Sequence, residues 1–183
     1  MIILNNNNLH VEIAELGAEI RKVTFCGKDR FWNGDEKYWT GVSPVLFPIC
    51  SGLPSDKFTF ENKEYILEKH GFARKSVFTV ESANDTSATF LLKDSPETFK
   101  KYPWHFELRI TYTLNSNNIE VTYDVKNTSD NAMYYSIGSH EAYLCENTIE
   151  DYDVIFERQE TLFAYELEGT LLSGEKKLIL KDS

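Results

Sequence analysis

Two of the four histidines occur in sequence settings that could support proton transfer. His70 lies in EKHGFARK and His140 in IGSHEAY, and their neighbours place both in loops or at strand ends. A histidine with an ordinary pKa of about 6.5 can donate and recover a proton at neutral pH. Loop histidines are also often solvated or capping residues, so the residue type alone leaves both interpretations open. His10 and His105 lie in strand-like runs and are expected to be surface or hydrogen-bonded residues.

The spacing of the residues gives less support to other chemistries. Neither His70 nor His140 has a ligand partner at the short spacing of most zinc sites, so we expect no metal. There is no G-x-S-x-G sequence, and Ser139 would point to the opposite face of a strand from His140. The same alternation separates Glu141 from His140. No glycine-rich phosphate loop precedes a helix, and we expect no cofactor.

What is left is acid–base chemistry on a small neutral substrate. Histidine and arginine can hydrogen-bond hydroxyl groups, and aromatic faces pack on the C–H groups of a sugar ring. The residues therefore suit a polyhydroxylated ring. Trp32, Trp39 and Trp104 could supply such a face, although core packing is the commoner role for each of them.

The elements that must position these residues have the periodicity of β-strands. Residues 106–114 (FELRITYTL) and 119–127 (IEVTYDVKN) alternate apolar and polar side chains on either side of an asparagine-rich turn, which predicts a hairpin. The run SPETFKKYP (95–103) predicts one helical turn capped by Ser95. Further strands are expected at residues 75–82, 87–94 and 152–158.

Strands with one polar face indicate antiparallel sheets packed face to face. We therefore predict an all-β fold, an antiparallel β-sandwich, built as one domain over residues 1–183 because no linker divides the chain. The run GEKKLILKDS (174–183) looks like a strand that has just begun to pair. An unfinished sheet edge of this kind invites pairing with a second copy, so a homo-oligomer is possible on sequence grounds.

Composition narrows the class of protein. The chain has 29 acidic and 19 basic residues and a formal net charge of −10, which argues against binding to nucleic acid or to an anionic membrane surface. Neither a signal peptide nor a membrane-spanning apolar run is evident. The three cysteines, Cys26, Cys50 and Cys145, are widely spaced, which favours a reducing compartment and a cytoplasmic location.

Six motifs occur in an order that resembles the aldose 1-epimerase, or galactose mutarotase, family in its LacX-type branch. They are GAEI (17–20), RFWNGDEKYW (30–39), SPVLFPICSGL (43–53), HGFAR (70–74), YPWHFEL (102–108) and YSIGSHEAY (135–143). The resemblance covers essentially the whole chain. It implies an antiparallel β-supersandwich that binds an aldose in a cleft on one sheet and interconverts its α and β anomers without metal or organic cofactor.

The resemblance also implies roles for individual residues. His140 would be the general acid that protonates the ring oxygen, while a glutamate takes the proton of the anomeric hydroxyl. The ring opens, the aldehyde end turns, and the ring closes on its other face. His70, Arg74 and Tyr143 are the expected substrate-binding residues, with Arg74 beside the sugar or a phosphate on it.

Three departures from the family pattern bear on these roles. Ser51 and Gly52 stand where relatives carry glycine and arginine, so a second basic group is missing and a sugar phosphate is disfavoured. Glu141 stands where relatives carry proline. The family's catalytic glutamate lies in a C-terminal section that has no counterpart here, so the sandwich and the acid–base pair are both expected to be incomplete.

Three hypotheses follow from this comparison. The chain is a working mutarotase in which a second chain or another carboxylate (Glu150, Asp151 or Asp153) supplies the base. Alternatively, it is a sugar-binding sandwich without catalysis, or a shortened family member whose missing strands are replaced by self-association. The sequence does not choose among galactose, glucose and other aldoses.

Overall fold

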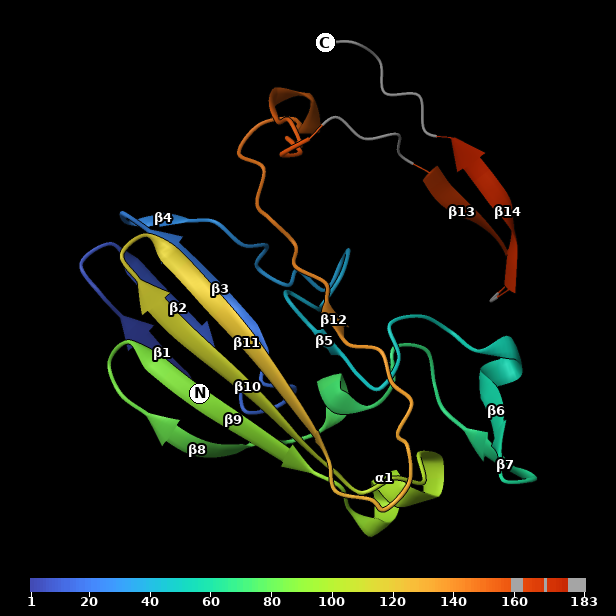
Figure 1. Cartoon of the computed structure of the whole chain (residues 1–183). Coiled ribbons are helices and arrows are strands. Elements are labelled where there is room, and N and C mark those ends of the chain that lie inside the picture. Colours follow the sequence, from blue (N-terminus) through green and yellow to red (C-terminus); the bar gives the residue numbers. More distant parts are fainter. Residues whose placement is uncertain (159–162, 170, 178–183) are drawn as a thin grey trace.

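The computed structural model describes residues 1–158, 163–169 and 171–177, and these form an almost wholly β architecture (Figure 1). One sheet contains, in spatial order, β1 (Ile2–Asn5), β2 (Leu9–Ile13), β3 (Ile20–Phe25) and β4 (Lys28–Asp29). The other contains, in spatial order, β11 (Asn118–Asn127), β10 (Phe106–Asn115), β9 (Ser87–Lys93) and β8 (Thr79–Ala83). All neighbouring strands in both sheets are antiparallel.

Smaller elements flank the two sheets. The two-stranded pairs are β5 (Val45–Leu46) with β12 (Gly138–Ser139), β6 (Lys57–Phe60) with β7 (Lys63–Ile66), and β13 (Phe163–Glu168) with β14 (Leu171–Lys177). The helical segments are η1 (Pro54–Asp56), η2 (Ala73–Lys75), α1 (Pro96–Lys101) and η3 (Ile149–Asp151). In the part of the chain that the structure describes, no helix is long and apolar enough to cross a membrane.

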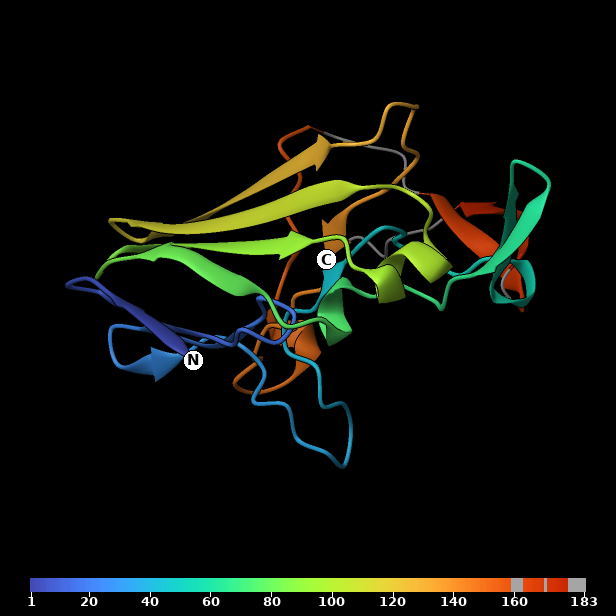
Figure 2. The same ribbon diagram turned by 90° about the horizontal axis from the view of Figure 1, so that it is seen from below.

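The two four-stranded sheets form two layers, as Figure 2 shows from below. The predicted antiparallel β-sandwich is thereby confirmed. Along β10 every second side chain is buried, which is the pattern expected of a strand with one face toward a core. The Tyr112 hydroxyl on β10 donates a hydrogen bond to the carbonyl oxygen of Ala18 at 2.8 Å, in the segment that connects β2 and β3. Burial raises the pKa of Tyr112, so this hydroxyl keeps its proton and remains a donor.

The predicted hairpin and helical turn are both confirmed. Strands β10 and β11 pair along their whole length, from Phe106 opposite Asn127 to Asn115 opposite Asn118. Helix α1 begins after Ser95, whose hydroxyl accepts from the Thr98 amide at 3.2 Å. The Thr98 hydroxyl accepts in return from the Ser95 amide at 2.8 Å, which completes a capping box.

Two strand predictions were wrong in whole or in part. Residues 152–158 are irregular, and Val154 and Ile155 are 82% and 90% exposed. An apolar run forms a strand only where a partner strand accepts its hydrogen bonds, and none of the described strands lies beside this run. The strand expected from residue 75 begins at Thr79, because Lys75 ends η2 and residues 76–78 hydrogen-bond to residues 15–17 before the pairing with β9 begins. Of the strand expected at 174–183, the first four residues lie in β14, and 178–183 are outside the described residues.

An aromatic part of the core lies where the segments next to β5 and β12 pack against the β8–β11 sheet. The fully buried ring of Phe47 contacts four other aromatic rings, those of Phe72, Tyr102, Phe106 and Tyr135. The carbonyl oxygen of Phe47 accepts hydrogen bonds from the amides of Phe72 and Ala73, at 3.0 and 3.1 Å. The segment after β5 is thus joined to the turn that contains HGFAR.

Gly71 allows this close approach of two backbones. Its φ is +67°, and a Cβ at this position would lie well within 3 Å of the Phe47 carbonyl oxygen. Gly27, in the turn between β3 and β4, has a similar φ of +79° but nothing within 4 Å of a Cβ position. Substitution of Gly27 would therefore test backbone strain alone, whereas substitution of Gly71 would test backbone strain together with steric contact.

We expect Gly71→Ala to destabilise the protein by at least ~2 kcal/mol more than Gly27→Ala. Both variants place a Cβ on a left-handed residue, which costs roughly 1–2 kcal/mol, but only Gly71→Ala also displaces the Phe47 backbone. Urea unfolding followed by circular dichroism measures both free energies of unfolding. Equal losses in the two variants would contradict the close packing of Gly71 on Phe47.

Candidate functional site

His70 lies in the turn between β7 and η2, and backbone groups hold it in place. Its own backbone is left-handed, with φ of +68°, a conformation that non-glycine residues adopt rarely and often at functional sites. The His70 amide donates to the carbonyl oxygen of Ser51 at 3.0 Å. Ring atom Nδ1 lies 2.8 Å from the carbonyl oxygen of Cys50. Segment 50–51 therefore fixes both the backbone and the ring of His70.

The hydrogen bond to Cys50 determines which ring nitrogen of His70 carries the proton. A carbonyl oxygen can only accept, so Nδ1 must be the donor. In the neutral ring, Nε2 then carries a lone pair and can accept a hydrogen bond. The His70 side chain is therefore suited to accepting a hydrogen bond from a hydroxyl group of a ligand.

The surroundings of His70 favour its neutral form. Partial burial lowers its pKa below 6.5, and the positive charges of Arg74, Lys69 and protonated His140 lower it further, although the hydrogen bond to Cys50 opposes the shift. Cys50 is a neighbour of both histidine segments, because its carbonyl oxygen lies against the His70 ring and its Sγ lies 3.2 Å from the Cβ position of Gly138, two residues before His140. Arg74 bonds to the carbonyl oxygen of Lys69, directly before His70. The structure thus brings together three of the four predicted site residues, from segments that are 66 positions apart between Arg74 and His140.

His140 follows β12 and is exposed. Its amide donates to the carbonyl oxygen of Pro44 at 3.2 Å, which extends the pairing of β12 with the chain before β5. Its imidazole lies beside the indole of Trp39, with ring centroids 5.1 Å apart and planes inclined at 55°. His140 is therefore positioned by its backbone and by one aromatic neighbour.

The neighbours of His140 in sequence face the other way. Ser139 and Glu141 both influence the pKa of the Tyr123 hydroxyl on β11, Ser139 by lowering it and the charge of Glu141 by raising it. Burial is the main cause of the raised pKa of Tyr123. Alternation of side chains thus sends Ser139 and Glu141 toward β11 while His140 projects toward Trp39.

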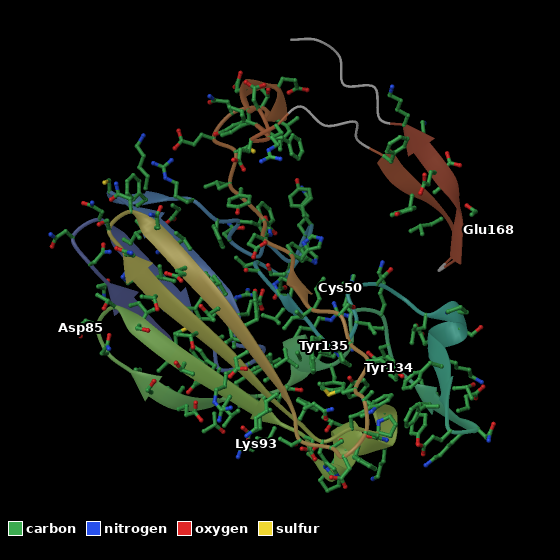
Figure 3. The ribbon with its side chains drawn as sticks, in the orientation of Figure 1. Cys50, Asp85, Lys93, Tyr134, Tyr135 and Glu168 are labelled. Carbon is green, nitrogen blue, oxygen red and sulfur yellow. The ribbon has the colours of Figure 1, made fainter. Side chains whose placement is uncertain are left out.

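Segment 134–136 forms the link between the two histidines. The Ser136 hydroxyl accepts from the Cys50 amide at 2.9 Å, and the Ser136 amide donates to the Pro48 carbonyl oxygen at 2.9 Å. Figure 3 shows Cys50 near Tyr135 and Tyr134, between the β8–β11 sheet and the β6–β7 hairpin. Strand β12, and with it His140, is thereby tied to the residues that hold His70.

Arg74 lies in η2 and supplies a positive charge near His70. One of its terminal nitrogens, Nη2, donates to the Lys69 carbonyl oxygen at 3.1 Å. Its Nε atom is buried and has no hydrogen-bond partner among the described residues. An unsatisfied buried donor costs about 1–3 kcal/mol, so this Nε–H is a donor that a ligand or a water molecule could satisfy.

Tyr143 contacts residues other than those described around His70. Its ring packs edge-on against Phe31, with centroids 5.3 Å apart, and it is 70% exposed. With Arg30, Phe31 and Glu141 it lines a separate groove of about 440 Å³ between β2–β3 and β11. Its role in substrate binding stays a prediction.

The carboxylates named as substitute bases are all exposed. Glu150 and Asp151 belong to η3, where the Thr148 hydroxyl accepts from the Glu150 amide and lowers the pKa of the Glu150 carboxyl by a further hydrogen bond. Asp153 follows in the irregular segment. No cluster of three His, Cys, Asp or Glu side chains that could hold a metal occurs in the described ranges.

The structure adds Trp39 to the residues of the site. Pattern analysis treated the three tryptophans alike, yet Trp104 is 2% exposed and Trp39 is 37% exposed beside His140. One signal in the sequence was available. Trp104 precedes an alternating strand, whereas Trp39 lies in an irregular stretch that ends in Thr40 and Gly41, where no core face is expected.

Comparison with known proteins gives consistent matches. The sequence profile of the aldose 1-epimerase family matches residues 1–178. The plasmid-encoded protein LacX of Lactococcus lactis subsp. lactis is 35% identical over 169 residues, which cover 86% of this chain and 56% of that protein. The resemblance to the LacX-type branch, predicted from the order of the motifs, is confirmed. The chain spans little more than half of the length of this curated relative.

Solved structures agree with this match. A galactose mutarotase related enzyme from Lactobacillus acidophilus superposes with a TM-score of 0.89 at 33% identity, covering 96% of this chain and 61% of its own. A galactose mutarotase-like protein from Lactobacillus casei gives a TM-score of 0.87 at 26% identity, with 97% and 67% covered.

The environment of His70 leads to a prediction about pH. Because its pKa is lower in the folded chain than the unfolded value of about 6.5, the unfolded chain binds more protons between the two values. The stability associated with neutral His70 is therefore complete above pH 6.5 and is lost as the pH falls through the lowered value. We expect His70→Asn to remove this part of the pH dependence, since asparagine tolerates positive φ and can still donate to Cys50.

Urea unfolding of both proteins between pH 4 and 8 measures this effect, and long-range proton–nitrogen NMR identifies the protonated ring nitrogen. A titration midpoint at or above 6.5, or a proton on Nε2 in the neutral ring, would contradict the assignment.

Proposed function

The chain belongs to the aldose 1-epimerase family, and on that premise we propose that it binds a free aldohexose and interconverts its α and β anomers by acid–base ring opening. The observation that carries the proposal is the convergence of His70, His140 and Arg74 from distant parts of the sequence, through the contacts of Cys50 and Lys69. Two histidines in one site, one held as an acceptor and one free to donate, meet the needs of proton transfer to and from a sugar.

In the proposed mechanism the protonated imidazole of His140 donates its proton to the ring oxygen of the sugar. A base removes the proton of the anomeric hydroxyl, the bond between C1 and the ring oxygen breaks, and an open-chain aldehyde forms. Rotation about the C1–C2 bond and the reverse proton transfers close the ring on the other face. His70 accepts a hydrogen bond from a sugar hydroxyl at Nε2, and Arg74 adds positive charge beside it.

The identity of the base is the open part of this proposal. Glu141 faces β11, and Glu150, Asp151 and Asp153 are exposed in and after η3. A carboxylate must come within roughly 2.6–3.2 Å of the anomeric hydroxyl to act. A second chain is the alternative source that we propose for it.

A second candidate function follows from the charges around His70. Among the described residues, the ionisable groups that act on it are Arg74, Lys69 and His140, all of which are cationic when protonated. If no carboxylate reaches the anomeric hydroxyl, a site with hydrogen-bonding histidines would bind a sugar without opening it. We therefore keep a non-catalytic carbohydrate-binding sandwich as the alternative.

The identity of the sugar and the cellular location of the protein are also proposals. The names of the two solved relatives refer to galactose mutarotase, which makes galactose the first aldose to test and glucose the second. Ser51 and Gly52 stand where relatives carry glycine and arginine, and the absence of that second arginine supports a free sugar over a sugar phosphate. We further propose a cytoplasmic location, which rests on the wide spacing of the three cysteines.

We expect the 183-residue chain to accelerate the equilibration of freshly dissolved α-galactose, and His140→Ala to lower that rate by ~10²–10⁴-fold. Polarimetry or anomeric proton NMR follows the reaction. His10→Ala is the matched control, because His10 lies on β2 and bonds only to Asn5 and Glu12 among the described residues. It should keep the full rate.

Calorimetric titration with galactose separates the two candidate functions. Sugar binding without acceleration would support the non-catalytic alternative. If the folded chain neither binds galactose nor accelerates its equilibration, both candidate functions are refuted.

A further inference from the structure

We propose that the indole of Trp39 is the platform on which the C–H face of the aldose ring lies, next to His140. This inference rests on the proposed sugar-binding function and identifies a specificity-determining residue for the same site. It starts from the contact of the Trp39 and His140 rings, 5.1 Å apart, and from the partial exposure of the indole.

The backbone around Trp39 holds the indole in a defined position. The Trp39 amide donates to the Asp35 carbonyl oxygen at 2.9 Å, and its own carbonyl oxygen accepts from the Trp32 indole nitrogen at 2.8 Å. The ring lies over Gly41, where a Cβ would come within 2.5 Å of it. A larger residue at 41 would displace the indole, so the glycine and the ring position belong together.

Two charged side chains attach this loop to the first sheet. The Glu19 carboxylate accepts from the amides of Val42 and Ser43, at 2.7 and 2.9 Å. Arg21 pairs with Glu19 at 3.1 Å and donates to the carbonyl oxygen of Thr40 at 3.0 Å. The residues just after Trp39 are therefore held on both sides of Gly41, which gives the loop the rigidity that a binding platform needs.

The other two tryptophans have structural explanations. Trp104 is in the core, and its indole nitrogen donates to the Ala132 carbonyl oxygen at 2.8 Å. Trp32 uses its indole nitrogen to hold the Trp39 carbonyl. Trp39 is the tryptophan of the three whose ring lies against a site histidine while remaining partly open to solvent.

The chemistry of such a platform defines its ligand. A pyranose ring is rigid and presents several C–H groups on one face, which bury apolar surface against an aromatic ring. Its hydroxyls and ring oxygen point outward around the edge. A ring lying on Trp39 therefore turns an edge toward the adjacent imidazole, where proton transfer to the ring oxygen is required. An acyclic sugar alcohol has similar hydroxyls but neither a ring oxygen nor a fixed face.

The test compares Trp39→Ala, Trp39→Phe and Tyr38→Ala by calorimetric titration with galactose and glucose. We expect Trp39→Ala to weaken binding roughly 3- to 10-fold, Trp39→Phe to restore part of the loss, and Tyr38→Ala to match the wild type. Tyr38 is the matched control because it is an exposed aromatic residue of the same loop whose ring packs on Trp32. Galactitol should bind at least about 10-fold more weakly than galactose, with an affinity that Trp39→Ala does not change.

Fluorescence gives a readout that a purely structural role would not move. Galactose should alter the tryptophan emission of the wild type and protect it from iodide quenching, and Trp39→Phe should abolish both effects while circular dichroism is unchanged. If Trp39→Ala binds galactose as tightly as Tyr38→Ala does, the platform is refuted while the sugar site stands. If the folded wild type binds no aldose, the sugar site and the platform are refuted together.

Discussion

The burial of Phe47 is the constraint on which the candidate site depends. Its ring is fully buried among aromatic side chains, and its carbonyl oxygen accepts two amides from the turn that follows His70. This packing determines where the next four residues run, because they leave a fixed point in the core. Those residues include Cys50 and Ser51, whose carbonyl oxygens hold the ring and the backbone of His70. The packing of Phe47, an apolar side chain, thus sets the position of His70, a side chain suited to hydrogen bonding with a ligand.

The two histidines differ in how their surroundings prepare them. His70 is half-buried, donates through Nδ1, and sits near positive charge, so its neutral form and its free Nε2 are favoured. His140 is exposed and has an aromatic neighbour instead. One imidazole is therefore prepared to accept a hydrogen bond, while the other is accessible for proton exchange. Both are held through backbone hydrogen bonds, so their placement depends on the path of the chain more than on any particular polar side chain.

The success and the failure of the strand predictions have one physical cause. Residues 106–127 contain both partners of a hairpin and the turn between them, so the pairing is local and alternation suffices to predict it. Residues 152–158 have an apolar pattern of the same kind, but a strand there requires a partner from elsewhere in the chain. Alternation reports which face of a strand could be buried, and it carries no information about whether another strand is available.

The sequence by itself determined the β class, the hairpin, the helical cap at Ser95 and, through the order of six motifs, the family; it also singled out His70 and His140 as candidate site residues. These features are local, or they are read as a linear order. Only the tertiary structure decided that Trp39 rather than Tyr143 lies beside His140, and that Cys50 and Ser136 link the two histidines. Tyr143 pairs with Phe31 through an isolated bridge and packs on its ring, whereas Trp39 reaches His140 from a distant loop that Glu19 and Arg21 hold in place.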